Sequence, residues 1–332
     1  MELLNPFTKL QSWGCTHIAK RPETGRLLVD LSPVFAYVRS NPESAYGIVP
    51  VYQQWLMVSP RWYIRAIMKS ERSRWQKMFL LAFGFTLGPL WTLFIHQMAN
   101  VRDVRWRGKA VADAITKDLV QQADSTEDGK LLIDVIGAGS GAYAIDAYLQ
   151  FQNRRAERSL TFTLVDQDGC TYGLARHTAY TRGMNDSEFA MNFPMHTADV
   201  LQDEFYSKHE ACTRNMVVMI GIGDHIDKVI RDRTTRQLKD SDSAEDVATT
   251  NQDLISLMQK IRRTLKPGGS LVFSFVSHNN EEAFLEKVVK WRHRYRSRKM
   301  IEELMKVAGW DMGKIEFTDG PTGIQHLMVA KK

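Results

Sequence analysis

A short apolar run that ends in a glycine-rich turn places the strongest constraint on how this chain of 332 residues can fold. Residues 131–136 have the composition of a buried strand, and Gly137, Gly139 and Gly141 follow at alternate positions. Glycine lets the backbone turn sharply and lets a ligand approach with no Cβ in the way. A helix that begins after such a turn offers free N–H groups to a polar or anionic part of the ligand. We therefore predict a nucleotide-binding strand, turn and helix here.

Short apolar runs alternate with helical periodicity from residue 131 onward, which predicts a mostly parallel, doubly wound α/β sheet. The predicted strands cover residues 131–136, 160–165, 216–220, 270–276, 314–318 and 324–330. The predicted helices cover residues 251–265 and 300–308. The stretch 225–250 is polar and lacks apolar periodicity, so we expect a surface insertion there.

The first part of the chain has a different character. Residues 1–129 read as helices and loops and hold six of the eight tryptophans, so we expect a helical N-terminal cap or substrate region. Residues 130–332 would then form the ligand-binding domain. The uncharged stretch 79–95 is slightly short for a membrane span and contains glycine and proline, so no transmembrane segment is predicted. No signal peptide is recognisable, and we expect a cytoplasmic location, with a peripheral position at a membrane surface left open.

Composition excludes some classes of protein and leaves others open. The three cysteines form no CxxC pair, which excludes a disulfide scaffold and a zinc module, and we expect no metal site. The net charge of +6 is compatible with nucleic acid, an anionic lipid surface or an acidic substrate, and it selects none of them.

The glycine-rich turn alone fits two kinds of nucleotide. Gly137, Gly139 and Ala142 match the dinucleotide pattern, whereas Gly137, Gly139 and Gly141 match a turn associated with S-adenosylmethionine. Asp166, after the second strand, is either an acid that binds ribose hydroxyls or a turn residue at a strand end. Asp199 either accepts a hydrogen bond from an adenine amino group or caps the helix that would follow.

A third landmark, the segment Leu265-Lys-Pro-Gly-Gly269, precedes the fifth strand. With the glycine turn and Asp166 in this order, residues 131–332 resemble the class I S-adenosylmethionine-dependent methyltransferases. The resemblance implies a Rossmann-like, seven-stranded sheet of order 3-2-1-4-5-7-6 with the last strand antiparallel. Segments 106–108, 291–297, 302–304 and 308–310 also resemble bacterial methyltransferase-like proteins found beside lysophospholipase-like hydrolases. The chain departs from that group at Met300, where an acid is expected, and in its long insertion.

The resemblance implies S-adenosyl-L-methionine as the cofactor. The glycines would line its methionine side, Asp166 would bind the ribose, and three residues near the second and third strands would flank the adenine. We expect Tyr143 either to close on the cofactor or to pack in the core. The expected cofactor site comprises Gly137, Ala138, Gly139, Gly141, Tyr143, Asp166, Gln167, Asp199, Val200 and Gly221. Arg105 and Arg107 are candidates to pair with the carboxylate of the cofactor.

Methyl transfer from a sulfonium needs positioning and exclusion of water, and it needs a base only when the nucleophile still carries a proton. The candidate catalytic residues are Asp224 and His225, after the fourth strand, and His278, after the fifth. For each we also keep a structural interpretation, as a capping aspartate or a surface histidine. The basic tract 290–299 is either a surface for nucleic acid or anionic lipid, or a solvated helix start.

The leading hypothesis is therefore an enzyme, a methyltransferase acting on a small, apolar or aromatic metabolite or a lipid-like acceptor in a capped pocket. The fourth strand is followed by Gly-Ile-Gly-Asp and lacks the Asn/Asp-Pro-Pro-Tyr/Phe segment by which methyltransferases of nucleic-acid bases resemble one another, which disfavours nucleic acid as substrate. The alternatives are an NAD(P)-dependent oxidoreductase and a protein that binds RNA or a membrane surface. The acceptor, the methylated atom and the oligomeric state stay open.

Overall fold

The computed structural model of the chain describes most of the second half and less than half of the first. The described residues are 73–75, 78, 99–124, 129–167, 169, 171–202, 205–206, 212–223, 226, 251–282 and 294–332. The stretch 79–95, the pair Asp224 and His225, and most of the insertion lie outside them. Within the described part, no helix is both long and apolar enough to cross a bilayer.

The chain divides into two compact units. One comprises Met1–Arg105 with His278–Arg292, and the other comprises Trp106–Ser277 with His293–Lys332. The second unit carries the sheet, and the following paragraphs describe that unit.

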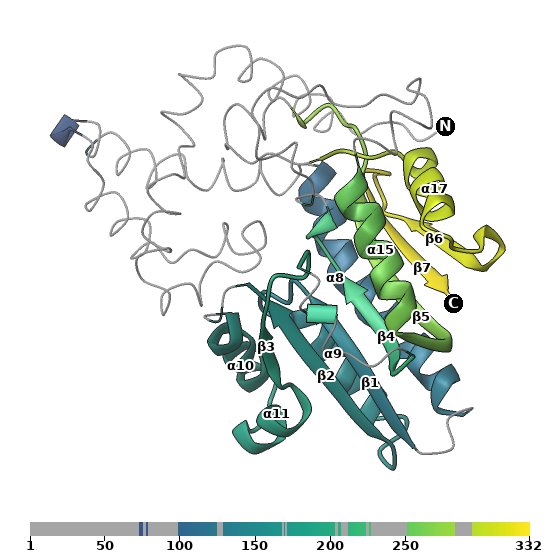
Figure 1. The fold of residues 1–332 in the computed structure, drawn as a ribbon. Helices are drawn as coiled ribbons and strands as arrows, with labels where there is room; N and C mark the ends of the chain where they lie inside the picture. The colour runs from purple at the N-terminus through teal and green to yellow at the C-terminus, as the bar shows by residue number, and fades with distance from the viewer. Residues whose placement is uncertain are drawn as a thin grey trace. The chain divides into compact units, whose positions relative to one another are not determined.

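Seven strands form one sheet of order β3-β2-β1-β4-β5-β7-β6 (Figure 1). The strands are β1 (Lys130–Ile136), β2 (Ser159–Asp166), β3 (Met195–Thr197), β4 (Arg214–Met219), β5 (Leu265–Val276), β6 (Ile315–Asp319) and β7 (Gln325–Lys331). Strands β1 to β5 pair in parallel, and β7 runs antiparallel to both of its neighbours. The fold class implied by the resemblance is therefore confirmed.

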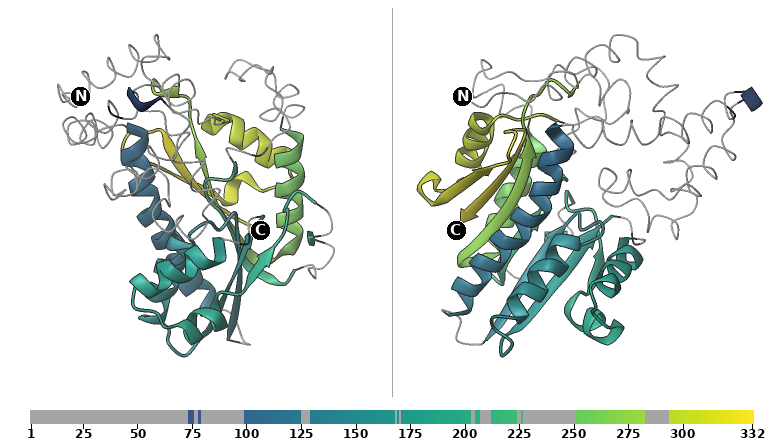
Figure 2. Two further views of the ribbon diagram at one scale, coloured as in Figure 1. Left: turned by 90° about the vertical axis from the view of Figure 1, so that its left-hand side faces the viewer. Right: turned by 180° about the vertical axis from the view of Figure 1, so that it is seen from behind.

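Helices cover both faces of this sheet (Figure 2). They are α8 (Ala99–Ala123), α9 (Ala142–Gln152), α10 (Thr171–Thr181), α11 (Asp186–Asn192), α15 (Gln252–Thr264) and α17 (Arg298–Val307), with a short 3₁₀ turn, η3 (Met312–Lys314). One apolar core joins one face of the sheet to helices α8 to α11, and a second core joins the other face to α15 and α17. Strands covered on both faces read as apolar runs, which is why the sequence marks them clearly.

Helix α8 belongs to the sheet from Trp106 onward. Val111, Ile115 and Leu119, spaced for one helical face, are completely buried in the first core. Buried Asp118 accepts hydrogen bonds from the Ser270 hydroxyl and from Gln122 Nε2, and it lies 3.1 Å from Lys331 Nζ. The boundary expected at residue 129 places this helix in the N-terminal region, and the division between the compact units falls at Arg105.

The basic tract is partly internal, which corrects its interpretation as a surface. Arg294 and Arg296 are buried, and Arg296 donates to Asn251 Oδ1 at 2.9 Å, to the Gly223 carbonyl at 2.8 Å and to the Ile226 carbonyl at 3.2 Å. One buried guanidinium therefore holds the loop after β4 against the start of α15.

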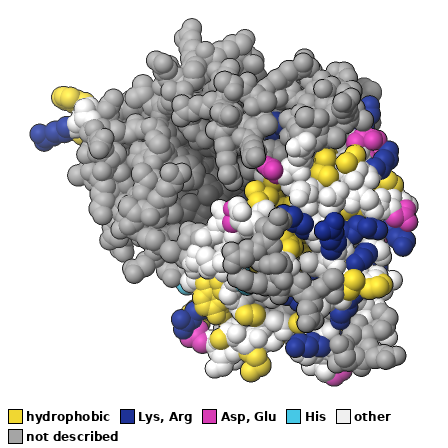
Figure 3. Space-filling model, in the orientation of Figure 1, with side chains coloured by type: hydrophobic (Ala, Val, Ile, Leu, Met, Phe, Trp, Pro, Cys, Tyr) yellow, Lys and Arg dark blue, Asp and Glu magenta, His cyan; other side chains and the backbone are white. Residues whose placement is uncertain are grey.

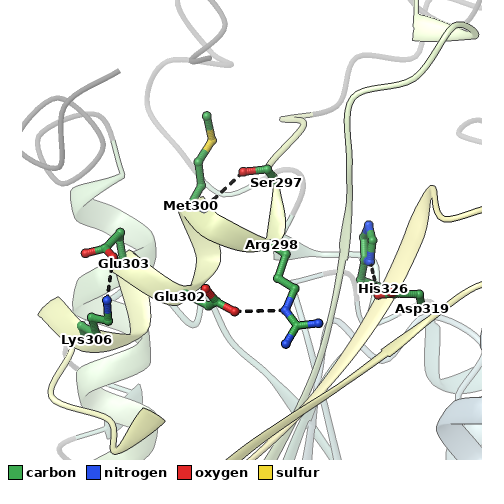
Figure 4. Close-up of polar contacts among 8 residues, drawn as sticks. All are labelled: Ser297, Arg298, Met300, Glu302, Glu303, Lys306, Asp319 and His326. Atoms are coloured by element: carbon green, nitrogen blue, oxygen red, sulfur yellow. Dashed lines mark hydrogen bonds and ion pairs between the residues drawn. The ribbon is translucent and has the colours of Figure 1, made fainter. Parts of the chain in front are cut away.

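The neighbouring residues of the tract stabilise α17. The Ser297 hydroxyl caps this helix by accepting from Met300 N at 3.2 Å (Figure 4). Arg298 lies over the Phe317 ring, 4.4 Å from its centroid, and pairs with Glu302 at 3.0 Å. Lys and Arg side chains do gather on the surface around α15, whose last turn carries Arg262 and Arg263 (Figure 3). Positive charge near a helix C-terminus interacts favourably with the helix dipole, so Arg262 and Arg263 stabilise α15 itself.

We expect Ile115→Ala to lower the free energy of unfolding by about 2–5 kcal/mol, because it leaves a cavity between α8 and the sheet. Urea denaturation of the full chain, followed by circular dichroism, measures this change. Val307→Ala is the matched control, because Val307 is 49% exposed, and its effect should stay within about 0.5 kcal/mol. Equal, small effects of both substitutions would show that α8 is not part of the core.

Candidate functional site

The glycine turn is hydrogen-bonded to the neighbouring strand β2. The amides of Gly137 and Ala138 donate to the Val165 carbonyl at 2.8 and 3.2 Å, and Gly141 N donates to the Ala138 carbonyl at 2.8 Å. Gly137 packs closely, because a Cβ there would lie 2.7 Å from Ile222 Cδ1. Gly139 has φ +51°, and no heavy atom of the described residues lies within 4 Å of the place that its Cβ would take. The turn therefore faces open space at Gly139 and protein at Gly137.

Asp166 lies directly against this turn. It is the last residue of β2, and its Oδ2 accepts from Gly139 N at 3.1 Å. The carboxylate therefore points toward the glycines, as a ribose ligand at this edge requires. Gln167, the next residue, is exposed.

The residues predicted to flank an adenine have more local contacts. Asp199 Oδ1 accepts from Leu201 N at 3.0 Å, and Oδ2 accepts from Gln202 Nε2 at 3.3 Å, so its carboxylate caps the turn that follows. This is the second of the two interpretations of Asp199. Val200 is buried in the second core. The segment still lies beside Asp166, whose carbonyl accepts from Ala198 N at 3.0 Å.

A tyrosine and an arginine meet at the same edge. The Tyr143 hydroxyl, in the first turn of α9, is buried and has no hydrogen-bond partner among the described residues. Burial raises the pKa of this phenol well above its usual value, whereas the positive charge of Arg107 lowers the pKa and the negative charge of Asp166 raises it. Arg107 Nη1 donates to Gln325 Oε1 at 2.8 Å, and a Cβ on Gly221 would lie 3.4 Å from Arg107 Nη2. Asp166 is thus joined to Gly139, Arg107 lies close to Gly221, and the charges of Asp166 and Arg107 both act on Tyr143.

None of the three predicted bases lies among the described residues of the unit that carries the sheet. Asp224 and His225 lie outside the described residues. His278 belongs to the other compact unit, where its exposed ring places Nδ1 2.9 Å from Glu282 Oε1. Among the residues that the structure describes, no cluster of His, Cys, Asp and Glu could hold a metal ion.

Sequence reasoning missed four polar residues at the carboxyl end of β5. Ser274 Oγ accepts from Gly221 N at 3.1 Å. Ser277 Oγ is hydrogen-bonded to His326 Nε2. On the other side of the ring, His326 Nδ1 lies 2.7 Å from Asp319 Oδ1, the contact drawn in Figure 4. The one sequence signal for this cluster was a polar residue, His326, inside an apolar strand. That signal does not show which residues His326 contacts.

We expect Tyr143→Phe to raise the free energy of unfolding of the ligand-free protein by about 1 kcal/mol, because it removes a buried hydroxyl that has no partner. Tyr148→Phe, on the same helix, is the control. Its hydroxyl accepts from Asn192 Nδ2 at 3.0 Å, so this change should cost about 1 kcal/mol. Denaturant unfolding of both variants measures the difference, and a loss of stability in Tyr143→Phe would contradict the prediction.

Comparisons with known proteins support the fold. No protein-family model and no curated protein matches this sequence. A solved structure described as a possible exported protein from Bordetella parapertussis has a TM-score of 0.54 at 12% identity, over 99% of each chain. The CurJ carbon methyltransferase has a TM-score of 0.48 at 12% identity, over 88% of this chain and 70% of that one. Magnesium protoporphyrin IX methyltransferase from Synechocystis PCC 6803, with bound SAH, has a TM-score of 0.43 at 15% identity, over 77% of this chain and 98% of that one. Identities this low show likeness of fold alone.

Proposed function

We propose that this chain is an S-adenosylmethionine-dependent methyltransferase that acts on a small, apolar or aromatic metabolite or a lipid-like acceptor. The observation that carries the proposal is the grouping of Asp166, Gly139, Tyr143 and Arg107 at the carboxyl edge of the sheet. In open α/β sheets, ligands bind at this edge, where the strand order reverses beside the first strand.

The residues present fit this cofactor. The Asp166 carboxylate can accept hydrogen bonds from ribose hydroxyls, and the open space at Gly139 admits a ligand against the backbone. The buried Tyr143 hydroxyl and the Arg107 guanidinium are donors suited to the amino-acid carboxylate of the cofactor. Gln167, Asp199 and Val200 would lie on the adenine side of Asp166.

When bound, the cofactor supplies a methyl group on a positively charged sulfur, which is already a good leaving group. The chain then has to orient the acceptor in line with this methyl group and exclude water. Of the expected N-terminal region, the part before Trp106, which holds five tryptophans, is proposed to provide that exclusion as a cap. A cytoplasmic location is part of the same proposal.

Two alternatives receive less support. A dinucleotide-dependent oxidoreductase of the common doubly wound order 3-2-1-4-5-6 has no antiparallel strand between its fifth and sixth strands, whereas β7 takes that place here. A protein that binds RNA or a membrane surface would use the basic tract, but the burial of Arg294 and Arg296 removes two of its charges from the surface.

We expect S-adenosylhomocysteine to bind and NAD(H) not to bind in isothermal titration calorimetry of the full chain. Gly139→Ala should weaken S-adenosylhomocysteine binding about 10-fold or more, because the new methyl group takes space needed by the ligand. Gly183→Ala is the matched control, since Gly183 also has a positive φ of +86° and nothing within 4 Å of its Cβ position among the described residues. Both variants carry similar backbone strain, so equal effects on binding would refute the site.

We expect Tyr143→Phe to weaken binding of S-adenosylhomocysteine about 5- to 10-fold, and Arg107→Met about 10- to 100-fold, because each removes a donor to the carboxylate. Methylthioadenosine lacks the amino-acid part of the cofactor and serves as the matched ligand. Its affinity should change little in either variant. Calorimetry with both ligands measures this selectivity, and equal losses for the two ligands would remove Arg107 and Tyr143 from the carboxylate end.

A further inference from the structure

Three polar side chains from different strands are joined end to end at the carboxyl end of β5. Ser277 follows β5, Asp319 ends β6, and His326 is the second residue of β7. His326 is hydrogen-bonded through Nε2 to Ser277 Oγ and through Nδ1 to Asp319 Oδ1, the latter at 2.7 Å. The close-up in Figure 4 shows the second of these contacts. A hydroxyl, an imidazole and a carboxylate in this order form a path along which a proton can move.

The sheet holds these groups in register. His326 lies opposite Phe275 on one side and opposite Asp319 on the other. Its ring stacks on Phe275 with centroids 4.8 Å apart and an interplanar angle of 16°. Ser277 N donates to the Ile324 carbonyl at 2.8 Å, which fixes the serine beside the ring. The imidazole is therefore oriented by packing as well as by its two polar partners.

Burial differs along the path in a way that suits proton transfer. The His326 side chain is 9% exposed, whereas the Asp319 side chain is 55% exposed. A neutral imidazole that donates from Nδ1 to the carboxylate presents the lone pair of Nε2 to the Ser277 hydroxyl. A proton received at Nε2 creates a positive ring beside a carboxylate, and this pair is open to water at its outer end.

Ser277 lies at the same edge of the sheet as the proposed site, because it directly follows the carboxyl end of β5. Ser274, three residues earlier and therefore directed to the opposite face, accepts from the Gly221 amide. Gln325, next to His326, accepts from Arg107. Successive strand residues point to opposite faces, so Arg107 approaches the edge from the face of α8 and His326 from the face of α15 and α17. An acceptor bound at this edge, on the face of α15 and α17, would face the half-buried Ser277 hydroxyl.

We propose that Ser277, His326 and Asp319 relay a proton away from the methyl acceptor, and that the acceptor is therefore an alcohol or a phenol. This inference rests on the proposed methyltransferase function. The acceptor O–H bond breaks and its proton passes to Ser277 Oγ, while the Ser277 proton passes to His326 Nε2. The O–C bond forms as the C–S bond of the sulfonium breaks, and the electron pair of that bond stays on sulfur. The imidazolium beside Asp319 then returns a proton to water.

The test measures S-adenosylhomocysteine formation by the full chain with two sets of probes. Catechol, umbelliferone and dodecanol carry a hydroxyl, whereas nicotinamide, quinoline and dimethyldodecylamine offer a nitrogen with no proton. We expect at least one hydroxyl probe to be methylated. Ser277→Ala and His326→Gln should each reduce the rate of this methylation about 100-fold.

Matched controls separate the relay from a structural role. Ser159→Ala and His177→Gln change an exposed serine and an exposed histidine of the same unit, and both should retain the wild-type rate. Calorimetry with S-adenosylhomocysteine checks that each variant keeps its cofactor affinity. Should His326→Gln unfold because the ring packs on Phe275, the smaller change Ser277→Ala still decides the question.

Several outcomes would overturn the relay. They are methylation of nitrogen probes alone, no methylation of any probe by a chain that binds S-adenosylhomocysteine, and unchanged rates in both relay variants. Labelling of Ser277 by a fluorophosphonate would also overturn it, because it would identify a serine nucleophile. Failure of the wild-type chain to bind S-adenosylhomocysteine would instead refute the proposed function itself.

Discussion

The central strands of the sheet must be covered on both faces, and the rest of the structure depends on this requirement. β1 pairs with β2 on one edge and with β4 on the other. Its residues Leu131, Ile133 and Val135 lie in one apolar core, and Ile136 lies in the other. Helix α8 supplies much of the cover on one face, and α15 with α17 supplies it on the other. Because parallel strands end at the same edge, this cover also fixes the glycine turn, Asp166 and Gly221 relative to one another.

Buried charges then connect the elements that the apolar cores hold together. Asp134 on β1 accepts from Arg214 Nε at 2.8 Å, and Arg296 satisfies three acceptors near the loop after β4. Removal of one partner of such a contact costs about 3–5 kcal/mol, because the other charge is left buried and unpaired. Gly223 is fixed by a hydrogen bond and by close packing. Its carbonyl accepts from Arg296, and a Cβ on it would lie 2.4 Å from Phe273 Cε2. Substitution of Arg296 would therefore disturb the loop after β4, at the edge of the sheet, although Arg296 itself is buried.

Local patterns in the sequence predicted the elements well and their partners poorly. The apolar runs predicted six strands, and the spacing of Leu254, Leu257 and Ile261 predicted α15. The three-residue strand β3 is too short to carry a periodic signal. Helical periodicity also does not say which surface a helix covers, so the place of α8 beside the sheet was not predictable. The cluster at His326 was missed because Ser277 lies 49 residues away in sequence, and only the antiparallel β7 brings the two together.

A buried hydroxyl without a partner does not by itself identify a site, as two tyrosines of this chain illustrate. Tyr143 and Tyr206 both have buried hydroxyls with no partner among the described residues, and burial raises the pKa of both phenols. Tyr206 packs against the second apolar core, and Lys260 Nζ of α15 lies 5.6 Å from its ring centroid. The negative charge of Asp134 also raises the pKa of Tyr206. The charges of Arg107 and Asp166 instead act in opposite directions on the pKa of Tyr143, and Asp166 accepts from Gly139 in the glycine turn. The cost of about 1–3 kcal/mol for an unsatisfied hydroxyl can be recovered there by a ligand that accepts its hydrogen bond. A site that gives up stability until its ligand arrives gains binding selectivity in return.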